Sequence, residues 1–435
     1  MHYVLVTIII RLMDKLLTVH EAAQKLDVSV DTIRRWEKKG LIKSARSNHN
    51  YRLFSIDELQ RVQNKVKGTS TVNNYRILKS GKKTKYTSIE LFAGAGGTAL
   101  GLENSGINHI LLNEVDKACV ETLKKNRPGW NVLHDDVANI DFKGWEGKVD
   151  VVQGGFPCQS FSYAGKGLGF GDIRGTMFFQ FARCVKEANP KIAIGENVRG
   201  LLMHDGGKTL ATMVKSLEDL GYKIAYRVLK SQYLDVPQKR ERLVIIAIRK
   251  DLDIPFIFPK EKDYTVSLRE ALKDCPKSHG QQYPEKKKKI MELIPPGGYW
   301  KSLPIELQKA YMGKSFYLGG GKTGMARRLS WDEPSLTLTC APAQKQTERC
   351  HPEETRPLAV REYARLQTFP DNWEFVGSLS SQYKQIGNAV PVNLGYYIGQ
   401  CIIAMLDNNK FEEVSMDKFK EFDKPDVFIQ VPLQF

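Results

Sequence analysis

From residue 86 onward, short apolar runs alternate with stretches in which hydrophobic side chains recur at helical spacing. A continuous apolar run predicts a strand buried on both faces, and recurrence with the period of a helix predicts an amphipathic helix. Such alternation is typical of a parallel sheet covered by helices, so the pattern predicts an α/β fold. The expected strands are 87–92, 109–113, 149–154, 192–195 and 243–248, and the expected helices are 98–105, 117–126, 176–188 and 207–220.

The alternation stops near residue 250. Residues 253–335 are rich in Pro, Gly and Lys and have weak periodicity, which favours a second, smaller domain over a continuation of the sheet. Helical patterns resume at 358–368 and 390–406.

Residues 16–66 carry the signals of a separate helical module. Thr18 followed by Glu21 is a capping box that opens a short helix, and Ser29 can cap a second, arginine-rich helix. Another capping box at 55–58 predicts a third helix. Two short helices joined by a few residues form a helix-turn-helix, which is typical of DNA-binding proteins.

The positive charge of the chain is concentrated at its N-terminal end. The net charge is +16, and residues 1–85 contain 18 Lys and Arg against 7 Asp and Glu. A basic surface suits a polyanionic partner such as nucleic acid. Residues 67–85 are polar and basic without apolar periodicity, so they are expected to form a linker.

The seven cysteines are scattered, without CxxC pairs or histidines at zinc spacing. This distribution argues against disulfides and structural zinc and favours a reducing compartment. The apolar run Val4–Ile10 is too short to span a bilayer, and Met13 is an alternative start of the protein. We therefore expect a cytoplasmic protein that does not associate with membranes.

A glycine-rich segment, Glu90–Gly97, follows the first expected strand and opens a helix. Its glycines permit a tight turn and bring a ligand close to backbone N–H groups at the helix N-terminus. Glu114 ends the next strand, where a carboxylate can accept two ribose hydroxyls, and Asp136 is placed to accept an adenine amino group. These residues predict a nucleoside cofactor and leave NAD, FAD and S-adenosylmethionine open.

Three chemically reactive residue types also fall at strand ends. Cys158 lies in a Pro-Cys turn after a buried strand, and Glu196 lies at the end of the next one. Arg240 and Arg242 precede a later strand. Functional groups of open α/β sheets gather at the carboxyl ends of strands, where nearby positive charge can lower the pKa of a thiol. A cysteine, a glutamate and arginines beside a nucleoside loop therefore indicate an enzyme.

The N-terminal module resembles the MerR/excisionase type of winged helix-turn-helix. The resemblance is carried by "TVHEAAQKLDVSVDTIRRWEKKGLI" and "NYRLFSIDEL". It implies that Asp31, Thr32, Arg34 and Arg35 face the major groove of DNA and that Arg52, in the wing, contacts phosphate.

Residues 86–406 resemble the DNA cytosine-C5 methyltransferase family. The ordered motifs are "ELFAGAGG", "NEVD", "GGFPCQSFS", "DIRGTMF", "ENVRGLL", "QKRERL", "RPLAVREYARLQTFP" and "QIGNAVP". Several motifs in the right order are more specific than any single one. The resemblance implies a Rossmann-like methyltransferase sheet with a smaller target-recognition domain. The implied organisation is helix-turn-helix 16–66, linker 67–85, catalytic domain 86–252, target-recognition domain 253–355, C-terminal part of the catalytic domain 356–406 and tail 407–435.

The same resemblance implies a mechanism on duplex DNA. The target cytosine must be flipped out, because its reactive edge is buried in the base stack. The thiolate of Cys158 adds to C6 and makes C5 nucleophilic, Glu196 donates a proton to N3, and Arg240 holds the base at O2. The methyl group comes from S-adenosyl-L-methionine, with S-adenosyl-L-homocysteine as product, and no metal is required.

Further site residues follow from the family motifs. Arg361 is expected to be structural. The residues implied to contact S-adenosylmethionine are Phe92, Gly94, Gly96, Gly97, Glu114, Asp136, Asn388 and Val390. The expected groove or phosphate contacts in the recognition domain are Arg327, Arg328, Lys345, Gln346 and Arg349.

Three alternatives remain. The tRNA-methylating branch of the family shares the cysteine and glutamate, although a long recognition segment and a winged helix favour duplex DNA. A transcription regulator with a vestigial methylase would not need Cys158, Glu196 and Arg240. An NAD-dependent oxidoreductase explains only the glycine loop. We expect the modification enzyme of a restriction–modification system, monomeric on its target, whose N-terminal module binds an operator.

Overall fold

The structure is a computed structural model of the chain. It describes residues 16–26, 28–38, 42, 44–46, 51–55, 59, 62, 75–157, 176–319, 322–408 and 416–419.

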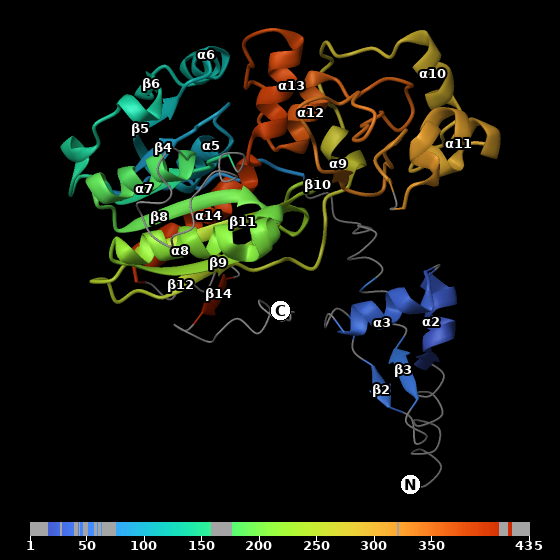
Figure 1. Cartoon of the computed structure of the whole chain (residues 1–435), viewed down its shortest axis with the longest axis horizontal. Helices are drawn as coiled ribbons and strands as arrows, with labels where there is room; N and C mark the ends of the chain where they lie inside the picture. The colour runs from blue at the N-terminus through green and yellow to red at the C-terminus, as the bar shows by residue number, and fades with distance from the viewer. Residues whose placement is uncertain are drawn as a thin grey trace.

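A seven-stranded sheet forms the centre of the larger unit, with the strand order β6-β5-β4-β7-β8-β11-β9 (Figure 1). The strands are β4 (Thr87–Leu91), β5 (Asn108–Glu114), β6 (Val132–His134), β7 (Val151–Gly154), β8 (Ile192–Val198), β9 (Tyr222–Lys230) and β11 (Glu241–Arg249).

The expectation of an all-parallel sheet is wrong for β11. This strand lies between β8 and β9 and runs antiparallel to both, whereas the other neighbouring strands pair in parallel. The connection from β9 contains only a single short turn, η6 (Ser231–Tyr233), and the two-residue β10 (Gln238–Lys239). Parallel neighbours need a longer crossover, usually through a helix, so the chain can only return antiparallel.

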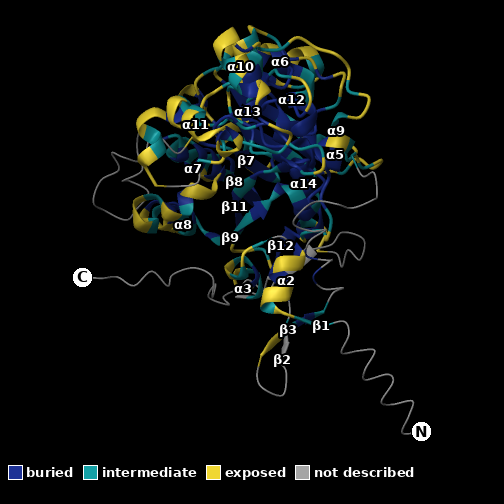
Figure 2. Ribbon diagram, turned by 90° about the vertical axis from the view of Figure 1, so that its right-hand side faces the viewer, coloured by how far each residue is buried: buried dark blue, intermediate teal, exposed yellow. Residues whose placement is uncertain are grey.

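Helices cover both faces of the sheet, and the buried strands lie between them (Figure 2). The helices α7 (Met177–Ala188) and α8 (Lys208–Asp219) share one apolar core with the sheet, and α14 (Val392–Leu406) packs in another. Every helix expected from residue 86 onward is present within a few residues of its predicted bounds. The remaining helices of this unit are α5 (Gly97–Ser105), α6 (Lys117–Asn126), α12 (Val360–Leu366) and α13 (Leu379–Asn388).

The helices α5 and α14 touch at their backbones. A Cβ atom on Gly101 would lie 2.5 Å from the carbonyl oxygen of Val392 and 2.6 Å from the backbone of Gly395. Glycine is thus needed here for close approach. The apolar stretch Leu379–Leu406 is long enough to cross a membrane, but 83% of its most apolar window is buried within the protein, so it serves as core.

The smaller unit has its own apolar core, formed by residues between Tyr283 and Ala326 together with Cys350. The first part of the expected recognition domain belongs instead to the larger unit, because β12 packs on α14. The expected tail contributes β14, which pairs with β12. The elements of 253–419 not yet given are β12 (Phe256–Pro259), α9 (Leu268–Leu272), α10 (Glu285–Glu292), α11 (Ile305–Met312), β13 (Ser335–Leu336) and β14 (Met416–Phe419).

Short 3-10 turns connect several of these elements. They are η1 (Val137–Asn139), η2 (Lys143–Trp145), η5 (Arg199–Gly207), η7 (Trp300–Ser302) and η8 (Gly313–Tyr317).

The N-terminal module has a separate core in which residues such as Ala22, Ile33 and Phe54 are buried. The predicted cap of its first helix is present, since the backbone N–H of Thr18 donates to Glu21 at 2.8 Å. The predicted third helix begins outside the described residues. The elements of the module are β1 (Leu16–Thr18), α2 (Val19–Leu26), α3 (Val30–Lys38), β2 (Ala45–Arg46) and β3 (Arg52–Ser55).

The last part of the expected linker is attached to the larger unit. The hydroxyl of Tyr75 donates to the carbonyl of Arg365 at 3.1 Å. The N–H of Leu78 donates to the side chain of Asn393 at 2.9 Å, and the same side chain donates to the carbonyl of Arg76. Residues 75–80 are therefore part of the larger unit rather than a free connection.

Candidate active site

The predicted site residues are arranged along one edge of the sheet. The parallel strands β4, β5, β7 and β8 end there, and β11 begins there because Arg242 pairs with Val198 at the end of β8. The strand order places the glycine loop first, then the segment that leads to Cys158, then Glu196 and finally the two arginines.

The glycine loop between β4 and α5 has a backbone that few residues can adopt. Gly94 and Gly96 have positive φ angles of 55° and 84°, and Phe92 has a φ of 58°. A Cβ on Gly97 would lie 2.0 Å from the carbonyl oxygen of Val390. The loop therefore requires its glycines, and the segment around Val390 closes one side of it.

The carboxylate of Glu114 is held by three backbone N–H groups. One oxygen accepts from Gly94 at 2.8 Å, and the other accepts from Val115 and Asp116 at 2.9 and 2.8 Å. Val115, which the sequence analysis did not single out, is 65% exposed and offers an apolar surface beside this carboxylate. Asp136 is exposed and caps a short turn through the N–H of Ala138 at 2.9 Å.

Cys158 lies outside the described residues, but the three residues before it are described. Gly155 is next to the proposed proton donor, since a Cβ at this position would lie 3.3 Å from Glu196 Oε2. The side-chain amide of Asn197 donates to the carbonyl of Phe156 at 2.8 Å. The loop that leads to Cys158 is thus fastened to the end of β8.

Glu196 forms an ion pair with Arg242, not with Arg240. Arg242 Nε lies 2.7 Å from Glu196 Oε1, and both side chains are 12% exposed. Burial lowers the pKa of Arg242, while the carboxylate of Glu196 raises it. The sequence indicated two candidate arginines. The antiparallel register, in which Val244 lies opposite Glu196, places Arg242 beside the carboxylate.

Arg240 is buried in the wall behind this pair. It is 1% exposed and donates to the carbonyls of Leu338 and Gly387 at 3.4 and 3.2 Å. Burial lowers its pKa to about 9, and the nearby charge of Arg242 acts in the same direction. The role of holding the base, predicted for Arg240, therefore fits Arg242 better.

The segment before α14 completes the surroundings of the site. Asn388 is exposed, and its side-chain oxygen accepts from the thiol of Cys340 at 2.9 Å. Arg240 also approaches the carbonyl of Asn388 at 3.5 Å. The structure thus brings the "QIGNAVP" segment next to both the glycine loop and Arg240.

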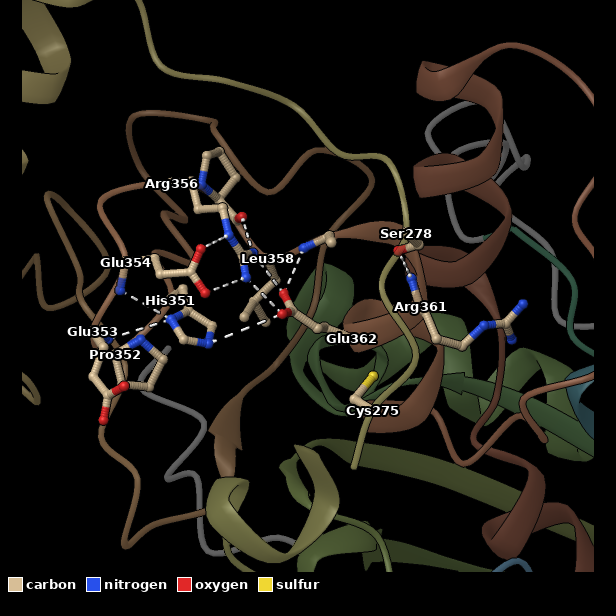
Figure 3. Close-up of polar contacts among 12 residues, drawn as sticks. Cys275, Ser278, His351, Pro352, Glu353, Glu354, Arg356, Leu358, Arg361 and Glu362 are labelled. Carbon is tan, nitrogen blue, oxygen red and sulfur yellow. Dashed lines mark hydrogen bonds and ion pairs between the residues drawn. The ribbon is translucent and has the colours of Figure 1, made fainter. Parts of the chain in front are cut away.

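Arg361 has structural contacts, as expected. Its guanidinium donates to the carbonyls of Pro370 and Trp373 at 3.1 and 2.8 Å. Its backbone N–H donates to Ser278 Oγ (Figure 3). Nearby, Glu362 holds the guanidinium of Arg356 through both carboxylate oxygens. These contacts tie α12 to the recognition segment and leave the reaction to other residues.

Two of the expected DNA contacts in the recognition domain are wrong. Arg328 is 3% exposed and donates to a cluster of backbone carbonyls that includes Met291 at 2.7 Å. Arg349 is 4% exposed and donates to Thr337 and Glu348. Both guanidinium groups satisfy buried carbonyls that would otherwise lack donors, so neither reaches a DNA groove.

The other side chains expected to contact DNA are at least partly exposed to solvent. Arg327 is half-buried over the ring of Tyr299, and Lys345 and Gln346 are exposed. In the N-terminal module Arg34 and Arg35 are exposed on α3. Arg52 pairs with Glu37 at 2.7 Å and is 42% exposed.

Comparison with known proteins identifies the family to which the larger unit belongs. The model of the family described as "C-5 cytosine-specific DNA methylase" matches residues 86–404. The chain belongs to the C-5 cytosine-specific DNA methylase family. It is thus a DNA cytosine-C5 methyltransferase, and DNA is its partner. Residues 18–54 match the MerR family of regulatory proteins.

Curated relatives extend over nearly the whole chain. The type II methyltransferase M.Eco47II of Escherichia coli is 55% identical over 400 residues, which cover 89% of this chain and 95% of that protein. M.PspPI of Psychrobacter is 53% identical and covers 88% and 95%. A solved structure, described as a DNA modification methyltransferase from an E. coli prophage, covers 74% of this chain and 100% of its own. It has a TM-score of 0.54 at 22% identity, which supports the fold.

The glycine loop has the features that a nucleoside-bearing cofactor needs. Gly96, the N-cap residue of α5, makes no side-chain cap hydrogen bond, so a ligand can approach the N-terminus of this helix. The left-handed glycines let a ligand approach the backbone, and Glu114 and Val115 add a carboxylate and an apolar surface. The donor set fits S-adenosylmethionine.

Proposed function

We propose that this methyltransferase is the modification enzyme of a type II restriction–modification system. It would methylate C5 of a flipped-out cytosine in duplex DNA with Cys158 as the nucleophile. The observation that supports the catalytic part is that Gly155, three residues before Cys158, lies next to Glu196, which pairs with Arg242 at the same sheet edge. Identity of 55% to a type II methyltransferase over 89% of the chain supports the biological role.

The methyl donor would be S-adenosylmethionine, held by Phe92, the glycines of the loop, Glu114, Val115 and Asp136, and closed in by Asn388 and Val390. When bound, it supplies an electrophilic methyl group. The chain's own part is to make C5 of cytosine nucleophilic. The Cys158 thiolate adds to C6, and electron density moves through the ring toward N3.

Glu196 would supply the proton that N3 accepts as the thiolate adds. Arg242 would orient this carboxyl group and donate to the O2 atom of the base. After methyl transfer, loss of the C5 proton to water expels the thiolate, N3 returns its proton to Glu196, and the aromatic ring is restored. Arg240, fixed on backbone carbonyls, would support the electrostatics of the site from behind.

The N-terminal module would bind a second DNA site, an operator that controls the linked restriction genes. Its support is the match of residues 18–54 to MerR regulators and the exposed Arg34 and Arg35 on α3. We further propose that the enzyme acts in the cytoplasm as a monomer on its methylation site.

Replacement of Cys158 tests the proposed reaction. Cys158→Ser keeps the size of the side chain but removes the thiolate, so incorporation of tritiated methyl groups from S-adenosylmethionine into duplex DNA should fall to background. Cys184→Ser is a matched control, because Cys184 is buried among apolar side chains away from the edge. Bisulfite sequencing of DNA from cells expressing the wild type would identify the methylated cytosine and its context. Full labelling by Cys158→Ser, or wild-type labelling of tRNA in place of DNA, would refute the proposal.

A further inference from the structure

A cavity of about 370 Å³ opens at the active-site edge, on the side away from the glycine loop. It forms where β8 and β9 end and β11 begins. Its wall contains five cations and, among the described residues, one acid, Glu241. The cations are Arg199, Lys230, Lys239, Arg240 and Arg242.

Four of these cations already pair with carboxylates. The pairs are Arg199–Glu241, Lys230–Glu261, Lys239–Glu333 and Arg242–Glu196. Arg240 differs from them. Within the described part of the chain it has no carboxylate partner, and its buried Nε has no hydrogen-bond acceptor.

The nearby carboxylate of Glu196 raises the pKa of Arg240 but is already paired with Arg242, so one acid faces two buried guanidinium groups. An anion in the cavity would therefore stabilise this wall. The two lysines can provide direct contacts. Lys230 and Lys239 are 42% and 29% exposed, and the Lys230–Glu261 distance of 3.3 Å is the longest of the four pairs. A lysine on a flexible stem can exchange an exposed carboxylate for a phosphate oxygen at little cost.

The position of the cavity identifies the anion. Along the sheet edge the cofactor loop comes first, then the Cys158 segment, the Glu196–Arg242 pair and lastly the cavity. If the base lies between Cys158 and Glu196, its two flanking phosphates must lie nearby, because only the deoxyribose separates them from the ring. We infer that this cavity binds a backbone phosphate next to the target cytosine, with Lys230 and Lys239 as contacts. The inference rests on the proposed function, because that function places the flipped base beside Glu196.

The test compares two double variants that remove equal charge. Lys230→Gln/Lys239→Gln alters the cavity, whereas Lys215→Gln/Lys250→Gln alters exposed lysines at the opposite end of the sheet. Initial methylation rates are measured on a duplex containing the target site over a range of salt concentrations. The cavity variant should raise KM for DNA and lower the slope of log KM against log salt by about one unit for each phosphate that is no longer bound. The control should keep the wild-type slope, and Lys230→Arg/Lys239→Arg should restore it.

A second duplex carries a neutral methylphosphonate at a phosphate flanking the target cytosine. This change should raise KM of the wild type and have no further effect on the cavity variant, because that variant already lacks the lysines that would bind this phosphate. An equal rise in both proteins would place the phosphate elsewhere and overturn the inference. An unchanged salt slope of the cavity variant would do so as well. Failure of the wild type to methylate DNA would instead refute the proposed function.

Discussion

At the scale of single residues, Arg240 and Arg242 lie two positions apart and have different environments. Arg242 pairs with Glu196, whereas Arg240 is fixed on backbone carbonyls and is fully buried. Their separation would let one short motif supply both the group proposed to contact the substrate, Arg242, and a buried charge that anchors the backbone behind it, Arg240.

This assignment can be tested with matched substitutions on β11. Arg242→Lys removes the Nε contact to Glu196, and Arg249→Lys removes an equivalent 2.7 Å contact to Asp251 at the far end of the strand. Loss of one oriented donor typically costs about 10²-fold or more in kcat. We expect such a fall in the single-turnover rate for Arg242→Lys and near wild-type rates for Arg249→Lys. If Arg240→Lys lost activity while Arg242→Lys kept it, the base-holding role would belong to Arg240, as the sequence motif implied.

At the scale of elements, the position of the glycine loop depends on the contact between α5 and α14. The loop opens α5, and α5 lies directly against the backbone of α14 through Gly101 and Gly395. Any side chain at this contact must push the helices apart, which would shift the loop relative to Val390.

Gly101→Ala therefore should destabilise the protein by about 1–3 kcal/mol, as expected for overpacking, and weaken binding of S-adenosylmethionine. Gly144→Ala is the control, because a Cβ there meets no atom within 4 Å. Thermal unfolding followed by calorimetry and cofactor binding by titration calorimetry would measure the two effects. Equal unfolding temperatures for both variants would show that the two helices have room for a methyl group between them.

At the scale of the whole molecule, the N-terminal module has its own core and joins the larger unit through a segment of which residues 75–80 are attached to that unit. The DNA binding proposed for the module can therefore be tested separately from methylation, provided that a truncation leaves Tyr75 and Leu78 in place.

We expect a protein lacking residues 1–74 to methylate DNA at the wild-type rate and to lose binding to its own promoter in a gel-shift assay. A protein lacking residues 1–80 should also lose thermal stability, because Tyr75 and Leu78 then no longer contact Arg365 and Asn393. Full-length Arg34→Ala/Arg35→Ala should reproduce the loss of promoter binding alone. Promoter binding that survives the 1–74 deletion would contradict the operator hypothesis.

Much of the architecture could be predicted because its signals are local. The α6 helix has the predicted bounds 117–126, and the predicted cap Ser29 receives the N–H of Thr32 at 3.2 Å. Periodicity and caps depend on residues within one or two turns, and the ordered motifs specified the family independently of any long-range contact. The glycine loop, the Cys158 segment and Glu196 could therefore be placed on strand ends from the sequence.

The tertiary structure decided what depends on partners distant in sequence. Arg240 contacts Leu338, 98 positions away, and Arg328 contacts Met291, 37 positions away. Neither burial nor the antiparallel register of β11 leaves a local signal, so exposed DNA contacts and structural arginines look alike in the sequence. Composition and motifs along the chain determined the family and the modules, whereas packing between remote segments determined which arginine meets Glu196.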